Sequence, residues 1–145
     1  MSHADRASSP IEVRVLLALQ GDLDAARLGV VLSIDEFESL HPALGLLEDV
    51  SDLREASVIR VTIGRELVGA VVLGMSADSG DETISGILAH VADRLQDEIV
   101  DSLRIAWPRC PDHAHPLKAE ERERVAIWVC PESGRRVADI GHLKQ

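Results

Sequence analysis

The sequence predicts an α+β protein, in which an N-terminal α/β body is followed by a small three-stranded module. Three observations carry this prediction. Apolar residues alternate over residues 57–73, which is the period of a β-hairpin. They recur every three or four residues from Ile84 to Leu103, which is the period of a long amphipathic helix. Pro108 then prevents that helix from continuing, and short β-branched segments alternate with two Cys-Pro turns.

The chain length sets the expected organisation. Its 145 residues suit one domain, or one domain with a small appendage. We expect a disordered polar tail over residues 1–10, the body over residues 11–106 and the module over residues 107–145. The core must be aliphatic, because only one Phe and two Trp are present and there is no Tyr.

The start of the body contains two expected elements. Charged and apolar side chains alternate at the beginning of residues 11–19, which favours a strand that ends at Gly21. A helix through the same segment is the competing interpretation. Asp22 can cap a helix over residues 23–32.

The middle of the body is expected to contain the hairpin. A short helical turn is predicted over residues 35–38 and a helix over residues 42–53, because proline suits the first turn of a helix. The hairpin strands are predicted over residues 57–63 and 67–73, joined by a turn. The second strand is apolar nearly throughout, so we expect it to be buried on both faces.

The long helix ends the body. Ser79 and Glu82 form a capping box before it, and it should run to about Ile105. Its apolar residues form a single stripe on one face. This helix and the apolar strand of the hairpin are the candidate surfaces for a protein partner or for a second copy of the chain.

The module contains both cysteines of the chain, and each is followed at once by proline. Residues 110–113 read Cys-Pro-Asp-His, and residues 130–134 read Cys-Pro-Glu-Ser-Gly. Each Cys-Pro can begin a tight turn that presents a thiolate and a second ligand three residues later. The other expected elements are a strand that begins at residues 115–118, a turn at residues 119–123, and strands over residues 124–129 and 135–140.

This order of turns and strands resembles the zinc-ribbon family, whose knuckles read Cys-Pro-x-Cys-Gly, over about residues 107–141. Carried over by position, the ligands that the resemblance implies are Cys110, His113 and Cys130. The fourth position falls on Ser133, which is a poor zinc ligand because its hydroxyl is neither soft nor readily ionised. His115, His142 or water can supply the missing ligand, and we include His115 in the predicted metal site.

Structural zinc is the predicted cofactor. A piece of about 35 residues cannot build a sufficient core of its own. Zinc would stabilise it by on the order of 10 kcal/mol. Two alternatives remain. One is a metal-free module docked on the body through Trp107, Ile127 and Trp128. The other is a disulfide between Cys110 and Cys130, which a reducing compartment disfavours.

Charge and hydropathy exclude several classes of partner. A net charge of −10 opposes nonspecific binding to nucleic acid or to an anionic membrane. No apolar run reaches the roughly 20 residues that a membrane helix needs, and no secretory leader is evident. We therefore expect a cytoplasmic protein. Its excess of Arg over Lys resembles proteins from GC-rich, actinobacterial-like bacterial genomes.

The predicted function is non-catalytic. Neither a nucleotide-binding loop nor a serine-hydrolase motif is present, and we expect no pocket beside so small a module. We predict a protein-binding adaptor, assembly factor or accessory subunit. One alternative is a small zinc metalloenzyme with Glu132 or Asp112 as its base. The other is a nucleic-acid-associated regulator that uses Arg135 and Arg136.

Overall fold

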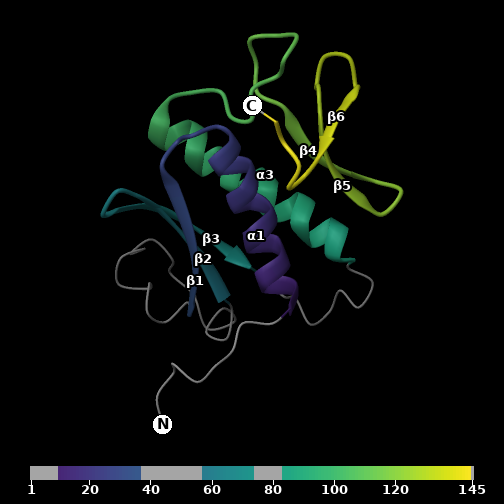
Figure 1. Ribbon diagram of the computed structural model, residues 1–145. Coiled ribbons are helices and arrows are strands. Elements are labelled where there is room, and N and C mark those ends of the chain that lie inside the picture. Colours follow the sequence, from purple (N-terminus) through teal and green to yellow (C-terminus); the bar gives the residue numbers. More distant parts are fainter. Residues whose placement is uncertain (1–9, 37–56, 74–82, 145) are drawn as a thin grey trace, which may run out of the picture.

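A computed structural model describes residues 10–36, 57–73 and 83–144 and confirms the α+β fold class (Figure 1). The strands form two antiparallel sheets, ordered β1-β2-β3 in the body and β4-β5-β6 in the module. The elements are α1 (Pro10–Ala25), β1 (Val30–Glu36), β2 (Ser57–Ile63), β3 (Glu66–Leu73), α3 (Ile84–Leu103), β4 (Lys118–Arg122), β5 (Val125–Val129) and β6 (Arg136–Asp139). Within these ranges, neither helix is long and apolar enough to cross a membrane.

Helix α1 replaces the strand that was predicted over residues 11–19. Val15, Leu19 and Leu23 recur every four residues, and each is at most 1% exposed. That spacing places one apolar row on a single helix face, toward the core. Pro10 begins the helix instead of ending a tail, and its fixed φ suits the first turn.

The segment after α1 is also extended rather than helical. The predicted helix over residues 23–32 is wrong, because α1 ends at Ala25 and β1 begins at Val30. The helical turn predicted at residues 35–38 is wrong for its first two residues, which belong to β1. The remaining residues of that turn and the helix predicted over residues 42–53 lie outside the described ranges.

The predicted hairpin is confirmed. Strands β2 and β3 are antiparallel, and Gly64, with a φ of 64°, turns the chain between them. The expected burial of β3 on both faces is wrong. Val71 is buried, whereas Val68 and Val72 are half-buried. In the described sheet β3 is an edge strand, and α3 packs against it.

Helix α3 is the predicted amphipathic helix. Its buried apolar residues include Ile87, Val91, Leu95 and Ile99, which recur every four residues. Thr83 caps its N-terminus, because the Thr83 hydroxyl accepts a hydrogen bond from the backbone N–H of Gly86 at 3.1 Å. The capping box at residues 79 and 82 lies outside the described ranges.

The module sheet begins with a strand where a turn was expected. Residues 118–122 form β4, which pairs with β5 along its whole length. Glu123 and Arg124 connect the two strands with φ values of 51° and 64°. Two successive residues with positive φ match the two-residue hairpin turn that fits the twist of antiparallel strands. The predicted strands over residues 124–129 and 135–140 correspond to β5 and β6.

The body and the module share one hydrophobic core. Helix α3 contacts β3 of the body as well as β4 and β5 of the module (Figure 1). Trp107 and Trp128, which are 1% and 0% exposed, join the same apolar cluster as Leu19 of α1. Their rings meet edge to face, with centroids 5.6 Å apart. The module therefore adds apolar burial to whatever stabilisation a metal supplies.

A buried carboxylate also links helix α1 to the C-terminal module. Asp22 of α1 is 0% exposed and accepts hydrogen bonds from the Trp128 indole N–H at 2.8 Å and from the Gly141 N–H at 2.7 Å. Its second oxygen accepts from the Leu143 N–H at 3.0 Å. Burial raises the pKa of Asp22, although the three hydrogen bonds oppose that rise. We call this arrangement the Asp22 latch.

The segment that contains residue 141 passes so close to α1 that only glycine fits at this position. Gly141 has a φ of 103°, and a Cβ added there would lie 3.1 Å from the Ala18 Cβ. We expect Gly141→Ala to lower the free energy of unfolding by about 2 kcal/mol, measured by urea denaturation.

Gly64→Ala is the matched control for this substitution. Gly64 also has a positive φ, but nothing lies within 4 Å of the added Cβ. It should therefore lose only about 1 kcal/mol through backbone strain. Equal losses in the two variants would show that the approach to Ala18 does not matter.

Candidate metal centre

The structure brings together the four residues that were predicted to bind metal. The ligand atoms of Cys110, His113, His115 and Cys130 all lie within 4.8 Å of one another. Both cysteines are free thiols rather than a disulfide, and each is only 2% exposed. The two histidines are half-buried. This cluster can hold a metal ion.

The distances within the cluster suit a tetrahedral ion. The Nδ1 atom of His113 lies 3.5 Å from the Cys110 sulfur and 3.3 Å from the Cys130 sulfur. The Nε2 atom of His115 lies 4.0 Å from the Cys130 sulfur. Bonds of about 2.3 Å to sulfur and about 2.0 Å to nitrogen give a tetrahedral S···N edge of about 3.5 Å. Small side-chain rotations are therefore enough to complete the site.

The first knuckle, residues 110–115, is a closed loop. The Cys110 N–H donates to the His115 carbonyl at 3.1 Å, and the Leu117 N–H donates to the Pro108 carbonyl at 2.7 Å. Below the loop, the buried Gln96 of α3 donates from its amide to the carbonyls of Trp107 and Leu117. The body thus holds the base of the loop, while the loop presents three of the four ligands.

The second knuckle, residues 130–134, is a tight turn. The Cys130 N–H donates to the Arg135 carbonyl at 2.9 Å, and the Gly134 N–H donates to the Cys130 carbonyl at 2.7 Å. Gly134 has a φ of 74°, so glycine suits the position that closes the turn.

Ser133 occupies the position of the fourth ligand in the family pattern, but it has a different role. Its backbone N–H donates to the Cys130 sulfur at 3.5 Å. Hydrogen bonds from the side chain and the backbone of Ser133 lower the pKa of the Cys130 thiol to about 6. The thiolate, which is the form that binds metal, is therefore favoured at neutral pH. His115, and not Ser133, is the fourth residue grouped in the cluster.

Outer hydrogen bonds orient both imidazoles. His113 turns Nδ1 toward the sulfurs, while its Nε2 lies 3.3 Å from the Glu132 carboxylate. His115 turns Nδ1 toward the Pro116 carbonyl at 3.2 Å, while its Nε2 lies 3.3 Å from the Glu132 carboxylate and 4.0 Å from the Cys130 sulfur. Carboxylates and carbonyls commonly hold the second nitrogen of metal-binding histidines in this way. Desolvation lowers the pKa of His115, but the bonds to Pro116 and Glu132 outweigh it and raise the pKa overall.

The other predicted site residues lie outside the cluster. His142 is exposed and is not among the four grouped residues. Arg135 pairs with Asp112 at 3.5 Å, and Arg136 pairs with Asp139. The basic spot considered for nucleic acid therefore carries its own acidic partners.

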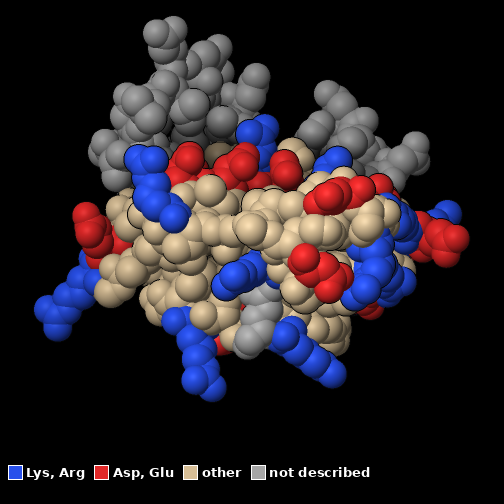
Figure 2. Space-filling view, turned by 90° about the horizontal axis from the view of Figure 1, so that it is seen from above, with Lys and Arg blue, Asp and Glu red and all other residues tan. Residues whose placement is uncertain are grey.

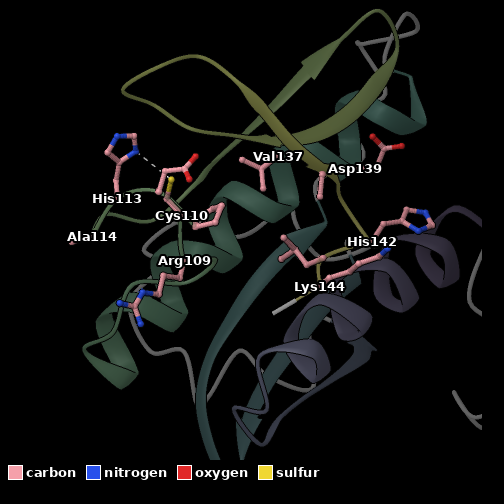
Figure 3. Close-up of a pocket in the computed structure, with 12 residues that line it drawn as sticks. Arg109, Cys110, His113, Ala114, Val137, Asp139, His142 and Lys144 are labelled. Atoms are coloured by element: carbon pink, nitrogen blue, oxygen red, sulfur yellow. Dashed lines mark hydrogen bonds between the residues drawn. The ribbon is translucent and has the colours of Figure 1, made fainter.

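A pocket lies beside the cluster, where none was expected (Figure 3). It has a volume of about 980 Å³, and Cys110 and His113 form part of its wall. The opposite wall is β6 with the last residues of the described chain. Sequence reasoning missed this pocket because its walls are brought together by the knuckle and by the Asp22 latch, neither of which is a local pattern.

The cluster offers as many candidate ligand atoms as a closed tetrahedral site requires. Two sulfur and two nitrogen atoms lie close enough together to hold a metal ion. No protein-family model matches this sequence, and no curated protein or solved structure matches it either.

Proposed function

We propose that this protein is a non-catalytic, protein-binding adaptor or accessory subunit whose C-terminal module is held by structural zinc. The observation that carries the zinc assignment is the cluster of two cysteines and two histidines within 4.8 Å. Thiolate and imidazole together favour zinc over the hard cations magnesium and calcium. The hydrogen bonds around the ligands support the same assignment, because they hold each ligand in its binding orientation.

A structural role is supported by how fully the chain surrounds the site. A catalytic zinc keeps an open position for water, whereas here four side chains of the protein are available. Both sulfurs are buried, and Gln96 anchors the loop that carries three of the ligands. The ion would join two turns that are 20 residues apart in the sequence, at Cys110 and Cys130.

Helix α1 offers a better protein-binding surface than the elements named from the sequence. The apolar stripe of α3 is buried in the core and is not available to a partner. On α1, Val13 and Leu17 lie one turn apart and are 38% and 65% exposed. An exposed apolar pair on a helix suits contact with another protein or with a second copy of the chain. Leu17→Glu should abolish such an association in light-scattering or pull-down measurements, whereas Arg14→Glu should not.

The zinc assignment is tested by elemental analysis of protein purified without a histidine tag. We expect one zinc per chain, and none in a Cys110→Ser/Cys130→Ser variant. Absence of bound zinc from the purified protein and after incubation with zinc would refute the assignment. A different bound metal would refute it equally.

Substitutions at His115 and Ser133 distinguish a ligand from an outer partner. His115→Ala should weaken zinc binding by more than about 100-fold in a chelator competition, because a direct ligand is removed. Ser133→Ala should retain one zinc per chain and weaken binding by about tenfold or less. Only the side-chain hydrogen bond to the Cys130 sulfur is lost, because the backbone N–H of residue 133 still donates to that sulfur. The reverse order would assign the fourth ligand to Ser133.

A zinc metalloenzyme is the second candidate, favoured by two observations. The Glu132 carboxylate lies 3.3 Å from both imidazoles, and a pocket adjoins the cluster. If His115 left the ion, water could bind there with Glu132 as its base. Cobalt substitution separates the two candidates. A four-coordinate spectrum without an exchangeable water supports the structural site, and a water-bound spectrum supports the enzyme.

A further inference from the structure

The pocket beside the cluster has two walls that are fixed by different devices. One wall is the first knuckle, and the other is β6 with residues 142–144 (Figure 3). The first wall is held by Gln96 and, under the proposed function, by zinc. The second is held by the Asp22 latch, through the N–H groups of Gly141 and Leu143. A pocket with two fixed walls is preformed, which reduces the entropic loss when a ligand binds.

The charge of the lining differs from the charge of the chain. The protein has a net charge of −10, but the lining includes Lys144 and Arg109. Its two carboxylates, on Asp112 and Asp139, pair with arginines that lie outside the lining. Figure 2, seen from above, shows basic and acidic side chains interspersed over the surface. Because both carboxylates of the lining have partners, the part of the pocket at Lys144 favours an anion, although the whole protein does not.

Apart from Cys110, His113 and His142, the remaining lining is apolar. Val137, Ala138 and Leu143 form a wall opposite the knuckle, and Leu143 is 8% exposed. A ligand that satisfies both parts of the lining carries one negative group and an apolar body. We propose that this pocket binds a small organic acid, with its carboxylate toward Lys144 and its apolar part against Val137 and Leu143.

The chain offers a matched pair of lysines for the test. Lys144 lines the pocket, whereas Lys118, the only other lysine, is exposed on β4 and does not line it. The experiment titrates zinc-loaded protein with 4-phenylbutyrate and follows backbone amide shifts by NMR. We expect shifts concentrated in residues 109–114 and 137–144. Lys144→Gln should weaken binding about fivefold, and Lys118→Gln should leave it unchanged.

The neutral amide of the same acid tests whether the charge matters. 4-Phenylbutyramide has nearly the same shape, and we expect it to bind at least about fivefold more weakly than the acid. Equal binding of acid and amide would overturn the proposal, as would shifts centred away from the pocket. Equal effects of the two lysine substitutions would also overturn it.

This proposal rests on the proposed zinc site only because zinc would hold the first wall of the pocket. Zinc binding and acid binding can be tested separately. Zinc content is measured by elemental analysis, and ligand binding is measured by amide shifts. Because binding free energies are linked reciprocally, an acid that needs the metal-held wall must also tighten zinc binding. We expect 4-phenylbutyrate to raise the zinc affinity of the wild-type protein in a chelator competition and to have less effect in Lys144→Gln. An unchanged zinc affinity at saturating acid would show that the pocket does not depend on the metal-held wall, against this proposal.

Discussion

Removal of the proposed zinc should unfold the C-terminal module and expose both tryptophans to water. Trp107 precedes the first knuckle in the sequence and Trp128 precedes the second, and both side chains are buried in the shared core. Zinc binding contributes on the order of 10 kcal/mol to the folding of small modules. Packing against the shared core should still stabilise the module without the metal. We therefore expect a smaller loss, of about 4 kcal/mol or more, in the free energy of unfolding.

Tryptophan fluorescence measures this loss directly, because the chain has no other tryptophan. A chelator and the Cys110→Ser/Cys130→Ser variant should each shift the emission to longer wavelength and lower the melting temperature. Added zinc should reverse the effect of the chelator but not the effect of the substitutions. Unchanged emission and melting after complete metal removal would show instead that the core alone holds the module in place.

Asp22→Ala should have the second largest effect, a loss of about 3 kcal/mol in the free energy of unfolding. The substitution leaves three donors, on Trp128, Gly141 and Leu143, without their acceptor. Buried donors without a partner are costly, and a hydrogen bond to a carboxylate is stronger than one to a neutral group. Urea denaturation of the zinc-loaded protein gives the value.

Two further variants test whether the loss depends on the charge of residue 22 and on its position in the helix. Asp22→Asn keeps the shape, but its NH₂ group would face one of the donors, so we expect an intermediate loss. Asp24→Ala lies on the same helix, is exposed and loses only a hydrogen bond from Gln20. It should lose about 0.5 kcal/mol or less. A comparable loss from Asp22→Ala and Asp24→Ala would show that the latch does not stabilise the fold.

The elements that sequence reasoning predicted correctly are those with a long regular pattern. The alternation over residues 57–73 and the stripe of α3 each extend over several repeats. Helix α1 was missed because Glu12 and Arg14 alternate with apolar residues at its start. The row of Val15, Leu19 and Leu23, four residues apart, was the contrary evidence.

Strand β4 depends on a partner elsewhere in the chain. Only Ala119 of β4 is buried, so the strand has no alternation to detect, and it is defined by pairing with β5. Gly21 was expected to end an element, but it lies inside α1. A Cβ at Gly21 would lie 3.7 Å from the Gly141 carbonyl oxygen, which is an ordinary contact distance, so the structure gives no steric reason for glycine there.

The candidate site was predicted in part for the same reason. The two Cys-Pro turns are local patterns, and they identified both sulfur ligands and His113. His115 was one of three options, because the choice depends on where the second knuckle lies in space. The donor role of Ser133 follows from the turn geometry rather than from its residue type. The Asp22 latch joins residues 106 to 121 positions apart and has no local pattern.

The Asp22 latch has a consequence for synthesis on the ribosome. The partners of this carboxylate are translated 106, 119 and 121 residues after it. Until those residues have been translated, the inner face of helix α1 therefore carries a charge that has not yet met its native donors. We expect the nascent chain to keep that face in water until residues 128–143 emerge.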